Sequence, residues 1–481
     1  MSGIIIENVR GLADSKWSGV KGAFAKIVGI DQHSKPGTIT VHQKLTVETG
    51  TVPDELCKVK VKLSTGERYW FSSESGKIWE DSSGTWRLAH TTTPAAGAAL
   101  CLGAFEYEAF LYWATQSRLH RIAISGISNW TANAVEDWAT FDITNANYHP
   151  MLVQNQTLFG GDGEQVFSVD TSGTFSSSAM DLTKPLIIKT LYPYDVDLLI
   201  GTEITNTVNR CALIRWDTVQ TTWQFADWLD ENGINAFLGL GSKEVLVQIG
   251  TYGKWYIYID GALQEFKRIP GTWTPTRYGL VYPQAVANLR GIPLFGFSNS
   301  QDVANSTGNP TDQGVYSFGR YSRDYPLVLS GLDYVISQND VTDIEIGALL
   351  VDNQDLYVSW SDGASAGIDK LDYTAKYASA YMEFMVVTVD PHNAVEFIKH
   401  FVDYSSLPAN TSVTFLYDAN HSGAFTTIGS GKHFNDTDNF QYYAEESVLA
   451  RAFQLRVNFT VSGNNAPEVE MLGFDIQDVQ T

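Results

Sequence analysis

Cysteine is scarce in this chain, and the few cysteines are not spaced as metal ligands or disulfide partners. Cys57, Cys101 and Cys211 are odd in number and far apart. The histidines, from His33 to His433, show neither HxxxH nor HExxH spacing. Zinc sites use clustered cysteine and histidine ligands, and disulfide-stabilised domains use even, closely spaced sets of cysteines. We therefore expect buried free thiols in a reducing compartment, and no metal or other cofactor.

Long apolar runs and a secretion signal are missing as well. No run of about 18 apolar residues occurs, which is the length that a membrane-spanning helix requires. The opening residues, MSGIII, lack the basic start and the long apolar core of a signal peptide. We expect no membrane span, and a protein that stays in the cytoplasm of the producing cell unless it leaves inside a larger particle.

Basic residues are few. The chain has 32 lysines and arginines against 54 aspartates and glutamates, which gives a formal net charge of −22. Tight binding of nucleic acid requires clustered Lys and Arg that neutralise phosphates, so the composition argues against this class of function. A surface that DNA slides past has the opposite requirement, because negative charge repels phosphate. The acidity fits such a conduit and an ordinary soluble protein equally.

The sequence does contain a repeated design of short β-strands and tight turns. In the clearest copy, apolar and aromatic strand segments at 59–63, 69–71, 78–79 and 85–86 are separated by Gly- and Ser-containing turns. Alternating residues of a strand face opposite sides. We expect Val59, Val61 and Leu63 to point inward, and the lysines at 58, 60 and 62 to point to water. This pattern predicts one antiparallel sheet of up to four strands.

Similar copies follow along most of the chain. They occupy residues 98–142, 150–180, 186–228, 235–268 and 277–328, with a less regular one at 343–373. Repeated four-stranded units of about 40–50 residues are typical of a β-propeller. The sequence therefore predicts an all-β protein with an irregular six- or seven-bladed β-propeller over residues 49–377.

The last quarter of the chain differs in composition. All 13 Trp lie at or before Trp360, and no Trp or Cys follows. After a Gly-, Ser- and Ala-rich stretch at 361–367, strand-like segments occur at 381–389, 394–401, 412–417, 424–428, 452–459 and 468–474. These features predict a separate C-terminal β-sandwich over residues 378–481.

Residues 1–48 are predicted to form an N-terminal arm and closing strand. Trp17, Val20, Phe24 and Ile27 are spaced as one apolar face of a short helix. A Pro-Gly turn at 36–37 precedes a predicted strand over 38–45. Two alternatives are open. The segment is a plug that covers the propeller or supplies its closing strand, or it is an arm whose four apolar residues bind a neighbouring subunit.

Motifs of enzyme active sites are incomplete. Segment 72–79, SSESGKIW, is close to the Asp-box turn of sialidase-type propellers, but no ordered set of arginines, tyrosine and acid accompanies it. The letters GASAG at 363–367 match a nucleophile elbow, which requires a following helix, whereas a strand-like run follows here. We expect a hairpin turn and a loop, respectively.

Carboxylates and phosphate-binding patterns give no stronger candidate. Closely spaced acids occur at 227, 230 and 231, at 343 and 345, and at 352 and 355, which we interpret as turn residues or solvated strand faces. The NDTDN segment at 435–439 lacks the ligand number of a calcium loop, and no phosphate-binding loop occurs. We expect no enzyme, and no catalytic, cofactor-binding or metal-binding residues.

The order of these parts resembles the tail-nozzle (tail-hub) proteins of short-tailed bacteriophages. The resemblance depends on residues 11–45, especially GIDQHSKPG at 29–37, and on the ending with FQLRVNF at 453–459 and EMLGFDI at 470–476. It implies a structural virion protein that forms a homo-oligomeric, hexameric ring around the DNA exit channel. Its partners would be other phage tail or head-tail connector proteins, and DNA would pass without specific binding.

The same resemblance implies a location in the virion tail, after synthesis in the cytoplasm of a bacterial host. One alternative stays open at this point. A propeller that binds or cleaves glycans, such as a receptor-binding tail component, has the same predicted fold, and fold alone does not determine function.

Overall fold

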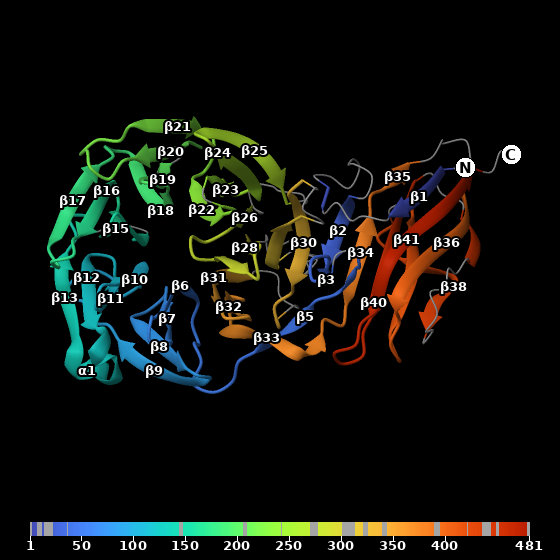
Figure 1. The fold of residues 1–481 in the computed structure, drawn as a ribbon, viewed down its shortest axis with the longest axis horizontal. Coiled ribbons are helices and arrows are strands. Elements are labelled where there is room, and N and C mark those ends of the chain that lie inside the picture. Colours follow the sequence, from blue (N-terminus) through green and yellow to red (C-terminus); the bar gives the residue numbers. More distant parts are fainter. Residues whose placement is uncertain are drawn as a thin grey trace.

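β-Strands make up most of this protein in a computed structural model (Figure 1). The structure describes residues 2–6, 12–13, 23–35, 37–143, 148–204, 209–241, 243–269, 278–300, 313–320, 326–338, 344–388, 395–420, 422–434, 444–448 and 452–478. Within these ranges, the only helical segments are the 3₁₀ turn η1 (Ile124–Asn129) and α1 (Trp130–Asn133). No helix in the described part of the chain is long and apolar enough to cross a membrane.

Six four-stranded antiparallel sheets form the blades of a β-propeller. In each of the first five blades, the four strands follow one another in sequence and are joined by turns or short connections, with η1 and α1 between the last two strands of the second blade. The first blade contains β6 (Cys57–Lys62), β7 (Arg68–Ser72), β8 (Lys77–Ser82) and β9 (Thr85–Thr91). The second contains β10 (Gly103–Tyr107), β11 (Phe110–Ala114), β12 (Arg118–Ala123) and β13 (Ala134–Thr140).

The next three blades repeat this arrangement. The third contains β14 (Met151–Gln154), β15 (Thr157–Asp162), β16 (Gln165–Val169) and β17 (Phe175–Asp181). The fourth contains β18 (Leu186–Tyr194), β19 (Asp197–Ile204), β20 (Cys211–Trp216) and β21 (Phe225–Leu229). The fifth contains β22 (Ile234–Gly239), β23 (Glu244–Ile249), β24 (Lys254–Ile259) and β25 (Ala262–Arg268). The predicted propeller is confirmed, and the predicted repeats match these blades closely.

The last blade is closed by a strand from the N-terminal segment. Its strands are β31 (Glu345–Asp352), β32 (Asp355–Ser361), β33 (Ala366–Lys376) and β5 (Gln43–Val47). In the pairing of β33 with β5, the buried Leu45 lies opposite Leu371. This agrees with the alternative in which residues 1–48 supply the closing strand. Because the two ends of the ring are hydrogen-bonded in one sheet, the propeller cannot open without breaking that sheet.

Between the fifth and the last blade, the chain enters a larger sheet. The strands there are β26 (Tyr278–Leu280), β27 (Val286–Leu289), β28 (Ile292–Ser300), β29 (Gly314–Gly319) and β30 (Val328–Tyr334). β27 contacts β22 on one side and β31 on the other, so this group completes the ring. The sheet then continues away from the propeller (Figure 1) through β2 (Phe24–Val28), β34 (Ala380–Phe384), β40 (Ala452–Thr460), β37 (Ser412–Ala419) and β38 (Thr426–Phe434). The short strand β35 (Val387–Thr388) also pairs with β40.

A second sheet faces the C-terminal part of the first. It contains β1 (Ser2–Ile6), β41 (Glu468–Asp478), β36 (Val395–Ser406) and β39 (Ala444–Val448). The ring of Phe474 lies 5.0 Å from that of Phe384 and 5.3 Å from that of Phe415, so an aromatic cluster joins the two sheets. Two further short strands, β3 (Ile30–Asp31) and β4 (Thr40–Val41), pair with each other.

The C-terminal strands were predicted well, but their independence is not confirmed. All six predicted strand segments overlap observed strands, namely β34, β36, β37, β38, β40 and β41, and β37 and β38 form the predicted hairpin. However, β2 and β1 come from the N-terminal segment and pair with β34 and β41. One apolar core runs from the propeller strand β28 to β40 and β41. Residues 378–481 therefore do not form these sheets by themselves.

The predicted N-terminal helix is wrong where the structure describes it. Trp17 and Val20 lie outside the described residues. Phe24 and Ile27 belong to β2, a strand between β30 and β34, and both side chains are fully buried. The ring centroid of Phe24 lies 4.8 Å from that of Phe384. The apolar spacing also fits a strand buried on both faces, and these two side chains are not available to bind a neighbouring subunit.

Candidate functional site

Several of the acidic groups noted in the sequence lie in ion pairs within and between blades. Asp352 accepts from Arg68 Nη1 at 2.5 Å and from Lys62 Nζ at 2.6 Å, which joins the last blade to the first. Asp355 pairs with Lys370 at 3.1 Å. Glu231 pairs with Lys254, while residue 343 lies outside the described part of the chain. Asp352 thus links two blades, and Asp355 and Glu231 each lie in an ion pair.

The other sequence motifs are turns. In segment 72–79, Ser72 Oγ accepts hydrogen bonds from the backbone N–H groups of Glu74 and Ser75, each at 2.9 Å. In GASAG, Asp362 Oδ1 accepts from the N–H groups of Ala364 and Ser365, and this turn joins β32 to β33. Both expectations are confirmed. The NDTDN segment lies outside the described residues, and no group of three or more metal-ligating side chains occurs within them.

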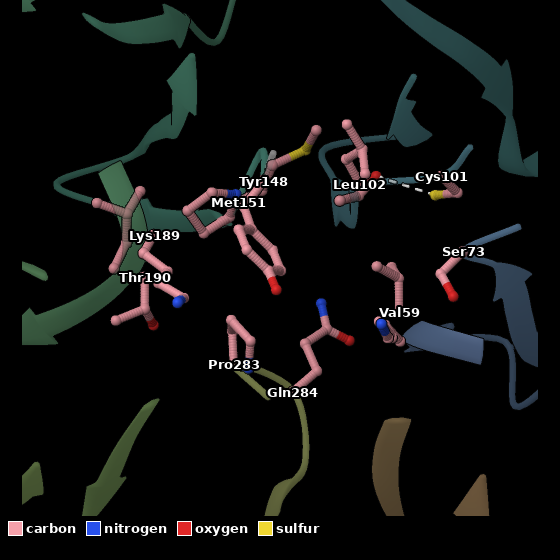
Figure 2. Close-up of a pocket in the computed structure, with 14 residues that line it drawn as sticks. Val59, Ser73, Cys101, Leu102, Tyr148, Met151, Lys189, Thr190, Pro283 and Gln284 are labelled. Atoms are coloured by element: carbon pink, nitrogen blue, oxygen red, sulfur yellow. Dashed lines mark hydrogen bonds between the residues drawn. The ribbon is translucent and has the colours of Figure 1, made fainter. Parts of the chain in front are cut away.

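A cavity of about 200 Å³ lies at the centre of the propeller. The inner strands β6, β10, β14 and β18 and the connection before β27 contribute to its wall (Figure 2). It is lined by Lys58, Val59, Ser73, Cys101, Leu102, Gly103, Tyr148, Pro150, Met151, Lys189, Thr190, Leu191, Pro283 and Gln284. No aspartate or glutamate occurs in this lining, although the whole chain is strongly acidic.

The side chain of Gln284 is held in one orientation. Its Oε1 accepts a hydrogen bond from the backbone N–H of Lys60 at 2.8 Å, and its backbone carbonyl accepts from Leu349 N at 3.0 Å. Because a backbone N–H can only donate, the amide oxygen must face Lys60. The Nε2 amide group then points into the cavity, where Figure 2 shows it opposite the ring of Tyr148.

The cavity also contains two lysine ammonium groups, which only donate hydrogen bonds, and hydroxyl groups, which donate and accept. Lys58 Nζ lies 3.3 Å from Glu345 and 4.1 Å from the ring centroid of Tyr282. Lys189 Nζ lies 2.8 Å from Glu203. Burial, with Glu203 and Glu345 nearby, raises the pKa of Tyr148, so its hydroxyl stays protonated. Burial also raises the pKa of the Cys101 thiol to about 12, which leaves no thiolate nucleophile here.

The neighbouring lysine on β6, Lys60, is half-buried and forms no ion pair among the described residues. Burial lowers its pKa to about 8. The alternation predicted for β6 is correct, since Val59, Val61 and Leu63 are buried. However, only Lys62 is exposed, because β6 is an inner strand of a closed ring and both of its faces meet protein.

Sequence reasoning did not single out Tyr148, Lys189 or Gln284. Tyr148 and Gln284 lie in connections that precede β14 and β27, and Lys189 lies within β18. They are far apart in the sequence and share no motif. Only ring closure brings them together, so no local pattern predicts the cavity.

The fourth blade carries several exposed apolar side chains, which lie on its outer strand β21 and in two of its turns. We call this set the aromatic edge; its members are Val196, Val219, Trp223, Phe225 and Trp228. The exposed fractions are 48% for Phe225 and 46% for Trp228. β21 is the terminal strand of its sheet and runs along the outside of the propeller (Figure 1). Phe225 and Trp228 are three positions apart in β21, so their side chains lie on opposite faces of this edge strand.

Comparisons with known proteins give similarity of fold. No protein-family model and no curated protein sequence matches the chain. A solved extracellular domain, described as part of a hybrid two-component system of B. thetaiotaomicron, is 11% identical with a TM-score of 0.48, over 84% of this chain and 47% of that one. The chain thus spans about half the length of that domain.

Two shorter propellers are covered almost completely by the alignment. The WD40 repeats of RRP9 are 11% identical with a TM-score of 0.46, over 69% of this chain and 99% of that one. A virginiamycin B lyase from Staphylococcus aureus is 9% identical with a TM-score of 0.43, over 68% of this chain and 99% of that one. We base no functional argument on these similarities.

Proposed function

We propose that this protein is a structural subunit of a bacteriophage tail, in which six copies form a ring around the channel through which DNA leaves the virion. The observation that carries the proposal is the aromatic edge of the fourth blade. A subunit of a ring requires an outward surface that a second copy covers. The assignment to a tail nozzle depends on the layout of the sequence, from residues 11–45 to the closing apolar strands.

The aromatic edge has two properties that favour association. β21 is an edge strand, so one side of its backbone lacks a strand partner in the described sheet. Its side chains include Phe225 and Trp228, and the guanidinium of Arg210 lies 4.6 Å from the ring centroid of Trp228. Aromatic side chains and arginine are enriched at the centres of protein interfaces, where single anchors contribute about 2 kcal/mol or more.

The charge of the chain supports a channel through which DNA passes without binding. The formal net charge is −22. Several described cations, such as Arg68, Lys189 and Lys254, are engaged by carboxylates. An acidic wall repels phosphate, so DNA would slide past it. Other tail or head-tail connector proteins would hold the ring above and below.

Electron microscopy and sedimentation velocity of the purified chain test the proposal. We expect rings with an open centre, and we expect Phe225→Ser combined with Trp228→Ser to abolish them. The melting temperature of the subunit should change little, because both side chains are about half exposed. Leu88→Ser, which removes a 45% exposed leucine from the first blade, is the matched control. A wild-type protein that stays monomeric, or rings that survive the double substitution, would contradict the proposal.

A glycan-binding propeller, such as a receptor-binding tail component, is the second candidate. The exposed indole rings of Trp223 and Trp228 favour it, since such rings offer a flat apolar face beside a polar group. Isolated propellers that bind host-surface glycans, with binding lost in Trp228→Ser, would support this candidate over the ring.

A further inference from the structure

We infer that the central cavity of the propeller binds a small ligand that carries an oxyanion, either a carboxylate or a phosphate group. The inference rests on the hydrogen-bond donors that converge in the cavity. It does not depend on ring assembly, because every residue in the argument belongs to one chain.

Two donors point into the cavity without an acceptor among the described residues. The first is Gln284 Nε2, whose direction is fixed by the bond between its Oε1 and Lys60 N. The second is the hydroxyl of Tyr148, which Figure 2 shows at the middle of the cavity. Donors that are already oriented bind an anion without the entropic cost of ordering them. Both groups donate hydrogen bonds, so a ligand that binds them must offer oxygen acceptors.

Two lysine ammonium groups, each paired with a carboxylate, lie near these donors. Lys58 and Lys189 come from the first and the fourth blade, and each ammonium group has one carboxylate partner among the described residues, Glu345 or Glu203. An ammonium group has three N–H donors, so each lysine can donate to a ligand while it keeps its carboxylate. The carboxylates themselves are not part of the cavity wall. Hydrogen bonds between charged groups are about twice as strong as neutral ones.

The size and the rest of the wall limit the ligand. A volume of about 200 Å³ holds a small organic molecule and no polymer. Val59, Leu102 and Met151 give one part of the wall an apolar character. A compact molecule with one anionic group and a partly apolar body, such as an acidic sugar or a small phosphorylated metabolite, fits both properties.

The test is isothermal titration calorimetry of the full chain with three probes: inorganic phosphate, glucuronate and glucose. Gln284→Glu is the decisive variant. A glutamate oxygen still accepts from Lys60 N, but the second oxygen replaces the donor and repels an anion. We expect the dissociation constant of the bound anion to rise about tenfold or more. Tyr148→Phe, which removes only the hydroxyl, should raise it about threefold to tenfold.

Gln264→Glu, on the exposed outer strand β25, makes the same change of charge and should leave binding unchanged. Circular dichroism of each variant checks the fold. Binding of glucuronate assigns an acidic sugar, and binding of phosphate alone assigns a phosphorylated ligand; either result supports the inference. No binding of either anion at about 10 mM, equal binding of glucose, or an unchanged affinity in folded Gln284→Glu would overturn it.

Discussion

Phe24 distinguishes the two roles predicted for the N-terminal segment, which are a plug or closing strand of the propeller and an arm that binds a neighbouring subunit. Its side chain is fully buried between β30 and β34 and contacts Phe384. We expect Phe24→Ala to lower the free energy of unfolding of the single subunit by about 3–5 kcal/mol, the cost of a large cavity in a core. Urea-induced unfolding measures this. Phe225→Ala, at the half-exposed aromatic edge, is the control and should change it by less than about 0.5 kcal/mol. A stable subunit that fails to assemble after Phe24→Ala would instead support the arm that binds a neighbouring subunit.

Asp162, at the end of β15, is a buried carboxyl group with an unusual titration. Its Oδ2 accepts from Ile143 N at 3.0 Å, whereas Oδ1 has no partner among the described residues. Burial raises its pKa to about 7, and Asp142 and Glu164 add to the shift. His149 Nδ1 lies 4.0 Å from Asp162 Oδ1. Burial lowers the pKa of His149 to about 4, so its ring is neutral near pH 7 and cannot balance the charge of the Asp162 carboxylate.

The sign of the resulting pH dependence follows from linkage. The folded state holds the Asp162 proton more tightly than the unfolded state does, so this group costs stability as the pH rises from about 4 to about 7. Asp162→Asn removes the titration. We expect the stability of the variant relative to wild type to increase between about pH 4 and about pH 7, by up to about 1.4 kcal/mol per pH unit within this window, and to level off above it. Chemical denaturation at several pH values measures this, and the exposed Asp260→Asn should show no such trend.

At the scale of elements, β5 decides whether the propeller stays closed. Leu45 is buried and Thr46, the next residue, is exposed, so one strand offers a test and its control. We expect Leu45→Ala to lower the free energy of unfolding by about 2–5 kcal/mol. It should also speed amide exchange in β33, because the pairing of β33 with β5 closes the ring. Thr46→Ala should lower the free energy of unfolding by much less than Leu45→Ala does. Equal and small effects of both substitutions would mean that the blade is stable without its closing strand.

The elements that the sequence predicted share a local cause. Blade strands alternate apolar and polar residues and end at Gly-, Asn- or Ser-containing turns, so each repeat contains its own signal, as at β6 to β9. β2 lacks this signal, because it is buried on both faces and its partners β30 and β34 are distant in sequence. The cavity was missed for the same reason. Tyr148 and Gln284 acquire their role from ring closure, which no local window contains.

At the scale of the whole molecule, the distribution of tryptophan offers a natural probe of cooperativity. All 13 Trp precede residue 361, and all except Trp17 lie between residues 70 and 360, so tryptophan fluorescence reports mainly on the propeller side. The change of composition after Trp360 suggested two folding units. In the structure, however, the N-terminal strands β1 and β2 pair with β41 and β34, and one apolar core continues from β28 to β40 and β41.

A shared core and shared strands predict a single transition. We expect thermal unfolding followed by tryptophan fluorescence and hydrogen exchange of peptides from β37, β40 and β41 to give the same midpoint, because unfolding the C-terminal sheets removes β2 from the side of β30. Residues 379–481 expressed alone should accordingly be much less stable than the same strands in the full chain, since β1 and β2 are then absent. If the C-terminal peptides exchange at a clearly lower temperature while the fluorescence is unchanged, the two parts fold separately, and the boundary expected near residue 378 is a true domain boundary.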